Sequence, residues 1–102
     1  MNISNLERIQ ANSTRELVQE KVNTKQSESY CIVLYNDDHN SFPHVIQCLM
    51  DVCEHSAEQA EQCAWIVHYK GKYPIKSGER EDMMTRCIAL LDRGLSAEVV
   101  LV

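Results

Sequence analysis

Residues 30–38, Tyr-Cys-Ile-Val-Leu-Tyr-Asn-Asp-Asp, decide the fold of this chain. The run up to Tyr35 consists of β-branched, aromatic and other apolar residues, a composition typical of a buried strand. The three polar residues that follow end the run, because Asn and Asp side chains readily bond to their own backbone in turns. The sequence therefore predicts a buried strand whose end carries an acidic turn.

Two helices are predicted after this turn. Ser41 can cap the first helix, and apolar residues at helical spacing continue it to about Glu54. Ser56 and Gln59 have the spacing of a capping box, which predicts a second helix that ends near His68. The two helices are therefore joined by a short connection.

A weak strand, a third helix and a last strand complete the pattern. Residues 72–76 alternate weakly and include Pro74, which lacks the N–H donor that a central strand needs, so we expect an edge strand there and a turn at residues 77–78. The third helix should stop before Gly94, and residues 97–102 favour a strand. The sequence thus predicts an α+β domain of order βααβαβ, in which three helices cover one face of a small three-stranded sheet.

The N-terminal part of the chain differs in composition from the rest. Residues 1–28 are rich in Asn, Ser, Gln and Glu, and their apolar positions are too scattered to anchor a core. A chain of 102 residues has room for about one domain. We therefore expect a flexible N-terminal extension over residues 1–28 and a folded core domain over residues 29–102.

Charge and hydropathy exclude several classes of partner. A net charge of −5 is unfavourable for nucleic-acid binding, which depends on clustered Lys and Arg. No apolar run approaches the roughly 20 residues that a membrane-spanning helix needs, and the first residues lack the basic and apolar parts of a secretory signal. We expect a cytoplasmic monomer that binds neither nucleic acid nor membrane.

The five cysteines are interpreted as core residues. Their number is odd and no pair has the C-x-x-C spacing of a zinc or redox site. Most of them fall on apolar stripes, where free Cys behaves as a small hydrophobe. We therefore expect buried free thiols, with no metal and no cofactor, at Cys31, Cys48, Cys53, Cys63 and Cys87.

The acidic turn at residues 36–38 and His68 carry the candidate chemistry. Each alone has an ordinary interpretation, as turn residues or as a surface histidine. Together, carboxylate and amide oxygens and an imidazole could accept hydrogen bonds from a cationic amine, beside apolar walls from Leu34, Val45 and Val67. This combination predicts a site for an ammonium group attached to a hydrophobic side chain.

Two separated motifs resemble those of the ClpS family of bacterial protease adaptors. They are N-D-D directly after the first strand and V-H-Y-x-G-K after the second helix, at residues 67–72. The resemblance covers most of residues 30–102. It implies an adaptor that binds the first residue of proteins whose N-terminus is destabilising, namely Leu, Phe, Tyr or Trp. The adaptor would deliver these proteins to the N-terminal domain of a ClpA- or ClpC-like AAA+ unfoldase and its peptidase.

The same resemblance implies roles for individual residues. Asn36, Asp37 and His68 would hold the α-amino group. Glu81 and Arg86 correspond to charged positions on the family's docking face for the unfoldase. The pocket for the first side chain would be formed by Leu34, Asp38, Asn40, Phe42, Val45, Ala64 and Val67.

The chain departs from the family pattern at two of these positions. Phe42 and Ala64 stand where the family commonly has Met, so the pocket is expected to be reshaped. Phe42 is stiffer than Met and should narrow the entrance, which favours Leu and Phe and excludes β-branched first residues. Alternatively, the ring could turn inward and fill the pocket.

Two other classes of function are compatible with the sequence. A small enzyme could use Asp37 and His68 as acid and base, but no nucleophile beside a base, metal cluster or glycine-rich loop is evident, so we expect no enzyme. A structural or assembly subunit is the second alternative, because the C-terminal domain of ribosomal protein L7/L12 shares this βααβαβ fold and a fold alone does not define a function.

Overall fold

The predicted order of strands and helices is confirmed by the computed structural model, which describes residues 29–102. The expected extension over residues 1–28 lies outside the described residues. The predicted turn at residues 77–78 is wrong, because Ser77 and Gly78 still pair with Cys31 and Tyr30. The elements are β2 (Tyr30–Tyr35), α1 (Phe42–Cys53), α2 (Ala57–Lys70), β3 (Lys72–Gly78), α3 (Arg80–Asp92) and β4 (Ser96–Leu101).

The three strands form one antiparallel sheet in the order β3-β2-β4. The central position of β2 explains its nearly continuous apolar sequence, and the edge position predicted from Pro74 is confirmed for β3. Ile32 pairs with Lys76 and Val33 with Pro74, so Ile75 is an extra residue in β3. This irregularity has the form of a β-bulge, which is common on edge strands.

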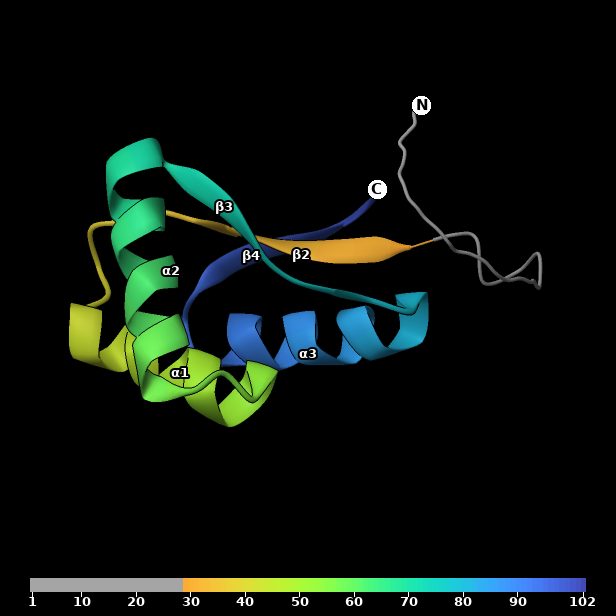
Figure 1. The fold of residues 1–102 in the computed structure, drawn as a ribbon, viewed down its shortest axis with the longest axis horizontal. Coiled ribbons are helices and arrows are strands. Elements are labelled where there is room, and N and C mark those ends of the chain that lie inside the picture. Colours follow the sequence, from red (N-terminus) through yellow and green to blue (C-terminus); the bar gives the residue numbers. More distant parts are fainter. Residues whose placement is uncertain (1–28) are drawn as a thin grey trace, which may run out of the picture.

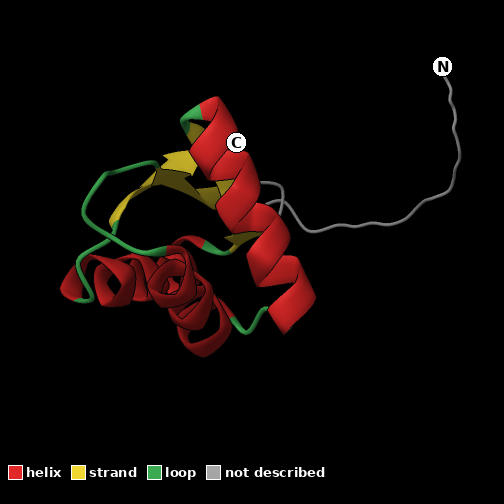
Figure 2. Cartoon of the chain, turned by 90° about the vertical axis from the view of Figure 1, so that its left-hand side faces the viewer, coloured by secondary structure: helices red, strands yellow, loops and turns green. Residues whose placement is uncertain are grey.

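All three helices lie on the same side of the sheet, as Figure 1 shows, and Figure 2 shows the strands as a separate layer beside them. The core lies between these layers. Its largest fully buried side chains are Ile32 and Leu34 from β2, Leu49 from α1, and Met83 and Leu90 from α3. One face of β2 therefore supports the helices, and the residues after β2 must cross toward α1.

All five cysteines are buried free thiols, as predicted. Burial raises the pKa of Cys53 to about 11, and it also raises the pKa values of Cys63 and Cys87. Such thiols are poor nucleophiles at neutral pH, because only the thiolate reacts. The cysteine side chains therefore contribute to the packing of the core.

Both predicted helix N-caps are present. Ser41 Oγ accepts a bond of 3.2 Å from the His44 N–H at the start of α1, and Ser56 Oγ accepts one of 3.1 Å from the Gln59 N–H at the start of α2. Each bond satisfies one of the N–H groups that a helix leaves without a partner in its first turn.

No helix among residues 29–102 is long and apolar enough to cross a membrane.

Candidate functional site

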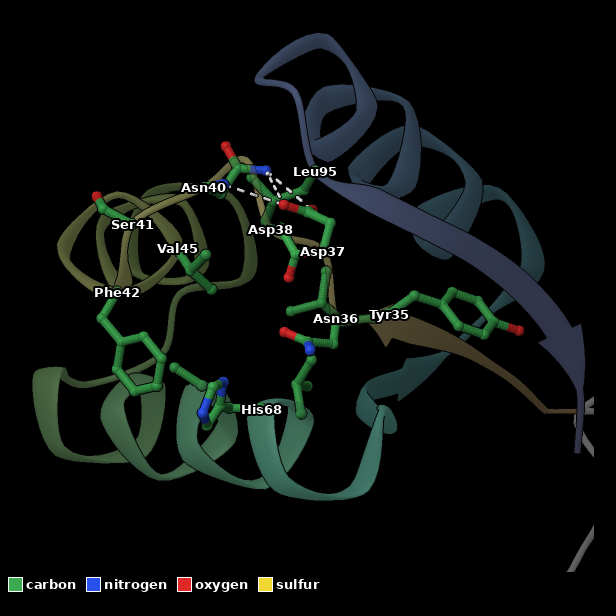
Figure 3. Close-up of a pocket in the computed structure, with 13 residues that line it drawn as sticks. Tyr35, Asn36, Asp37, Asp38, Asn40, Ser41, Phe42, Val45, His68 and Leu95 are labelled. Atoms are coloured by element: carbon green, nitrogen blue, oxygen red, sulfur yellow. Dashed lines mark hydrogen bonds between the residues drawn. The ribbon is translucent and has the colours of Figure 1, made fainter.

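A pocket of about 280 Å³ opens where the end of β2, the start of α1 and the C-terminal half of α2 meet (Figure 3). Every residue that the sequence analysis assigns to the amine or to the first side chain lines this pocket. Its lining consists of Leu34, Tyr35, Asn36, Asp37, Asp38, Asn40, Ser41, Phe42, Val45, Ala64, Val67, His68 and Leu95.

Asp37 organises the loop between β2 and α1. Its Oδ1 accepts bonds from the backbone N–H groups of His39 and Asn40, at 2.9 and 3.0 Å. The Asn40 side-chain amide lies 3.0 and 2.9 Å from Oδ1 and Oδ2 (Figure 3). Asp37 therefore stabilises the loop as well as supplying negative charge, which agrees with the turn interpretation of the acidic residues.

The charge of Asp37 is stabilised by these bonds. Partial burial raises the pKa of the carboxyl group, but the hydrogen bonds from the Asn40 side chain and from the backbone N–H groups of His39 and Asn40 outweigh it and lower the pKa overall. Hydrogen bonds to the ionised form favour that form. Asp37 is therefore negatively charged at neutral and at mildly acidic pH.

The loop is also anchored to the turn between α3 and β4. Asn40 Nδ2 donates to the carbonyl oxygen of Gly94 at 2.9 Å, and His44 Nε2 lies 2.9 Å from the carbonyl oxygen of Arg93. Gly94 has a φ of 90°, which glycine adopts at little cost. This anchoring brings the buried Leu95 to the pocket wall.

His68 is brought to the pocket by the end of α2. The Asn36 N–H donates to the Gly71 carbonyl oxygen at 2.9 Å, so the end of β2 lies against the last turn of α2. Gly71, with a φ of 90°, closes that turn through a bond of 2.8 Å from its N–H to the Val67 carbonyl oxygen. Figure 3 shows the side chains of Asn36 and His68 facing the open centre of the pocket.

Phe42 forms part of the wall and leaves the pocket open. Its ring centroid lies 4.7 Å from that of Trp65 and 5.4 Å from that of His68, with interplanar angles of 70° and 75°. Edge-to-face contacts of this kind are a favoured arrangement of aromatic rings. Contacts with α2 therefore hold the ring to one side of the opening (Figure 3).

The pocket has two chemically different sides. Hydrogen-bond acceptors are supplied by the end of β2 and by His68, whereas α1, α2 and Leu95 supply apolar surface. A ligand with a donor group directly beside an apolar side chain would match both. In residues 29–102, no group of His, Cys, Asp or Glu side chains is arranged to hold a metal ion.

Glu81 and Arg86 lie on α3, away from the pocket. Arg86 has partners within the molecule, because Nη1 donates to the Val52 carbonyl oxygen at 2.6 Å and Nε donates to Asp82 Oδ1 at 2.9 Å. Its Nη2 also lies 3.8 Å from Glu54 Oε2. Arg86 thus joins α3 to the end of α1, a structural contribution that helical spacing could not reveal.

Residues 25–98 match the family model described as "ATP-dependent Clp protease adaptor protein ClpS". A curated relative, the ATP-dependent Clp protease adapter protein ClpS of Thermosynechococcus vestitus, is 31% identical over 78 residues, which cover 76% of this chain and 83% of the relative. The solved structure of Agrobacterium tumefaciens ClpS2 bound to L-phenylalaninamide aligns with a TM-score of 0.71 at 21% identity, over 74% of this chain and 98% of that one. The structural likeness shows a shared fold, and the sequence matches show the family. This chain belongs to the ClpS family of Clp protease adaptor proteins.

Proposed function

We propose that this chain is a non-enzymatic adaptor that binds the first residue of substrate proteins when that residue is Leu, Phe, Tyr or Trp. It then delivers them to the N-terminal domain of a ClpA- or ClpC-like AAA+ unfoldase for degradation. The observation that carries the proposal is a single pocket with acceptors on one side and apolar walls on the other. A free N-terminus presents a cationic amine and a side chain on one carbon atom, which is the combination that these two sides match.

The amine is assigned to the polar side. A protonated α-amino group has three N–H donors and a positive charge, and it needs acceptors when it leaves water. Asn36 and His68 provide acceptor atoms, and the ionised carboxylate of Asp37 adds a negative charge. Hydrogen bonds that involve a charged group contribute roughly 1.5–3 kcal/mol each.

The side chain is assigned to the apolar side. A volume of about 280 Å³ lies just below the roughly 300–1,000 Å³ typical of pockets for drug-sized ligands, so it suits one side chain and little more. The ligand of the Agrobacterium protein, L-phenylalaninamide, carries a free amine beside an aromatic side chain. That chemistry is the one that the pocket fits.

Binding is tested by fluorescence anisotropy with labelled peptides that differ only at their first residue: Leu, Phe, Tyr, Trp, Ile, Val and acetyl-Leu. We expect acetylation to weaken the Leu peptide roughly 10- to 100-fold, because it removes the charge and two donors. Asn36→Ala should also weaken binding, and it is a cleaner change than Asp37→Ala, which would also release the loop. Equal affinity for free and acetylated peptides would overturn the proposal.

Delivery is tested separately on α3. Glu81 is exposed, whereas Arg86 contributes to the packing of α1 and α3. We therefore expect Glu81→Lys to weaken binding to the unfoldase N-terminal domain while peptide affinity stays unchanged. If Glu81→Lys binds the unfoldase like the unmodified chain, the docking face lies elsewhere.

A further inference from the structure

Four rings gather beside the pocket and form what we call the aromatic rim: Phe42, Trp65, His68 and Tyr69. The chain contains one Phe and one Trp, and both belong to this rim. Large aromatic side chains are ordinarily used to fill a core, because they bury much apolar area. Their presence at the surface needs an explanation.

The rim is exposed and ordered by mutual contacts. Trp65 and Tyr69 stack with their centroids 5.4 Å apart and an interplanar angle of 17°, yet 43% of Trp65 and 76% of Tyr69 remain exposed. The residues that α2 buries are Ala60, Cys63, Ala64 and Val67, so Trp65 and Tyr69 are not part of the stripe that packs on the core. Exposed apolar surface that is contiguous is a common sign of a binding site.

The rim is continuous with the pocket. Phe42 and His68 belong to both, since they line the pocket and also contact Trp65, at centroid distances of 4.7 and 6.1 Å. His68 lies 5.4 Å from Tyr69 as well. A group that leaves the pocket on the side of His68 therefore meets exposed aromatic rings at once.

We propose that the aromatic rim binds the second side chain of the same substrate chain and favours an aromatic residue there. This inference rests on the proposed function, which places the first residue in the pocket. Consecutive Cα atoms are 3.8 Å apart, so the second residue stays within reach of His68 and its neighbours. Side chains alternate in direction along an extended chain, so the second one points away from the pocket floor and toward the surface where the rim lies.

An aromatic second side chain suits this surface better than a small one. Aromatic rings pair at centroid separations of about 4.5–7 Å, and Tyr69 offers most of its surface for such a contact. We expect a Leu-Phe peptide to bind roughly fivefold more tightly than a Leu-Ala peptide of otherwise identical sequence. The gain should come from the rim alone.

The experiment compares these two peptides by anisotropy on four proteins: the unmodified chain, Tyr69→Ala, Trp65→Leu with Tyr69→Ala, and Gln62→Ala. Gln62 is an exposed residue of α2 outside the pocket lining and serves as the matched control. We expect the preference for Phe at the second residue to shrink in Tyr69→Ala and to vanish in the double variant. Leu-Ala affinity should stay within about twofold in Tyr69→Ala and in Gln62→Ala, and Gln62→Ala should keep the preference. In the double variant the ratio of the two affinities is the readout, because loss of Trp65 also frees the Phe42 ring.

A second readout locates the contact. Trp65 is the only tryptophan, so its emission reports directly on the rim. We expect the Leu-Phe peptide to change this emission more than the Leu-Ala peptide does. Equal affinity of the two peptides for the unmodified chain, or a preference that persists in the double variant, would overturn the inference and leave the pocket intact. Failure of both peptides to bind would overturn the proposed function and this inference together.

Discussion

His68 faces the pocket, where its imidazole can accept a hydrogen bond from a cationic amine. Asp37 supplies the opposite charge, because its lowered pKa keeps the carboxyl group ionised. We predict that His68→Ala weakens binding of a Leu-initiated peptide roughly tenfold. His68→Asn should lose less affinity, because its amide oxygen is also an acceptor. Anisotropy measures both variants, and unchanged affinity in His68→Ala would contradict the role of His68.

Phe42 should determine which first residues enter. Its ring is fixed by Trp65 and His68, so it cannot adapt as a Met side chain would. We predict that Leu and Phe peptides bind roughly tenfold more tightly than Ile and Val peptides, and that Phe42→Ala narrows this difference. Ala64→Met adds volume on the facing helix, and its affinities for the same peptides are measured beside those of Phe42→Ala. Tighter binding of Ile or Val peptides than of Leu peptides to the unmodified chain would refute this role.

For individual residues, the sequence predicts which side chains lie close together better than it predicts their functions. Two motifs predict that the acidic turn and His68 lie together, and both line one pocket in the structure. The composition of the turn predicts that Asp37 bonds to its own backbone, but the particular donors, the N–H groups of His39 and Asn40, depend on the conformation of the loop. Leu95 carried no local signal either, since only the anchoring of Asn40 to Gly94 brings it to the wall.

The end of α2 should depend on the backbone conformation of Gly71. Gly71 has a φ of 90°, and no atom lies within 4 Å of the place where a Cβ would stand, so any cost of Gly71→Ala is backbone strain and not a clash. We predict that Gly71→Ala lowers the free energy of unfolding by about 1–2 kcal/mol, measured by urea denaturation. Gly71→Asn should lower the free energy of unfolding by less, because Asn tolerates this conformation. Equal stability of Gly71→Ala and the unmodified chain would show that the turn relaxes.

The contact between α1 and α3 through Arg86 should also contribute to stability. Removing the Arg86 side chain leaves the Val52 carbonyl oxygen without its donor and breaks the contact with Asp82. We predict that Arg86→Met lowers the free energy of unfolding by roughly 1–2 kcal/mol, again by urea denaturation. Glu81→Ala should change it by less than about 0.5 kcal/mol, as expected for an exposed residue. If Arg86→Met proves as stable as the unmodified chain, Arg86 is available for the unfoldase.

The sequence predicts elements well where the signal is local. Ser41 and Ser56 marked the helix starts, and Pro74 marked the edge strand. The irregular register at Ile75 and the continuation of β3 through Gly78 were missed, because they depend on pairing with β2, which is distant in the sequence.

The stability of the whole domain should depend on pH through His55. This residue is buried, its Nε2 lies 2.9 Å from the Ile75 carbonyl oxygen, and its Nδ1 has no hydrogen-bond partner among the described residues. Burial lowers its pKa, the bond to Ile75 opposes this, and the charge of Lys76 adds to the lowering. The unfolded chain therefore takes up the proton at a higher pH than the folded domain does.

The sign follows from that difference in proton binding. As pH falls below the ordinary histidine value of about 6.5, the unfolded state is favoured, so the free energy of unfolding should fall by up to about 1.4 kcal/mol per pH unit. Urea denaturation between pH 7.5 and pH 5 measures it. His55→Asn should remove this contribution to the slope, whatever its effect on stability at neutral pH. A slope unchanged in His55→Asn would show that other groups are responsible.

The central claim is that one pocket receives the free first residue of another chain. The most direct test is a titration of the ¹⁵N-labelled protein with a Leu-initiated peptide and with its acetylated form, followed by amide chemical shifts. We predict shifts for the free peptide that concentrate at Leu34, Asn36, Asn40 and His68, and little change with the acetylated one. Shifts centred elsewhere, for example along the groove between α2 and β3 lined by Ile66 and Tyr73, or equal responses to both peptides, would contradict the claim.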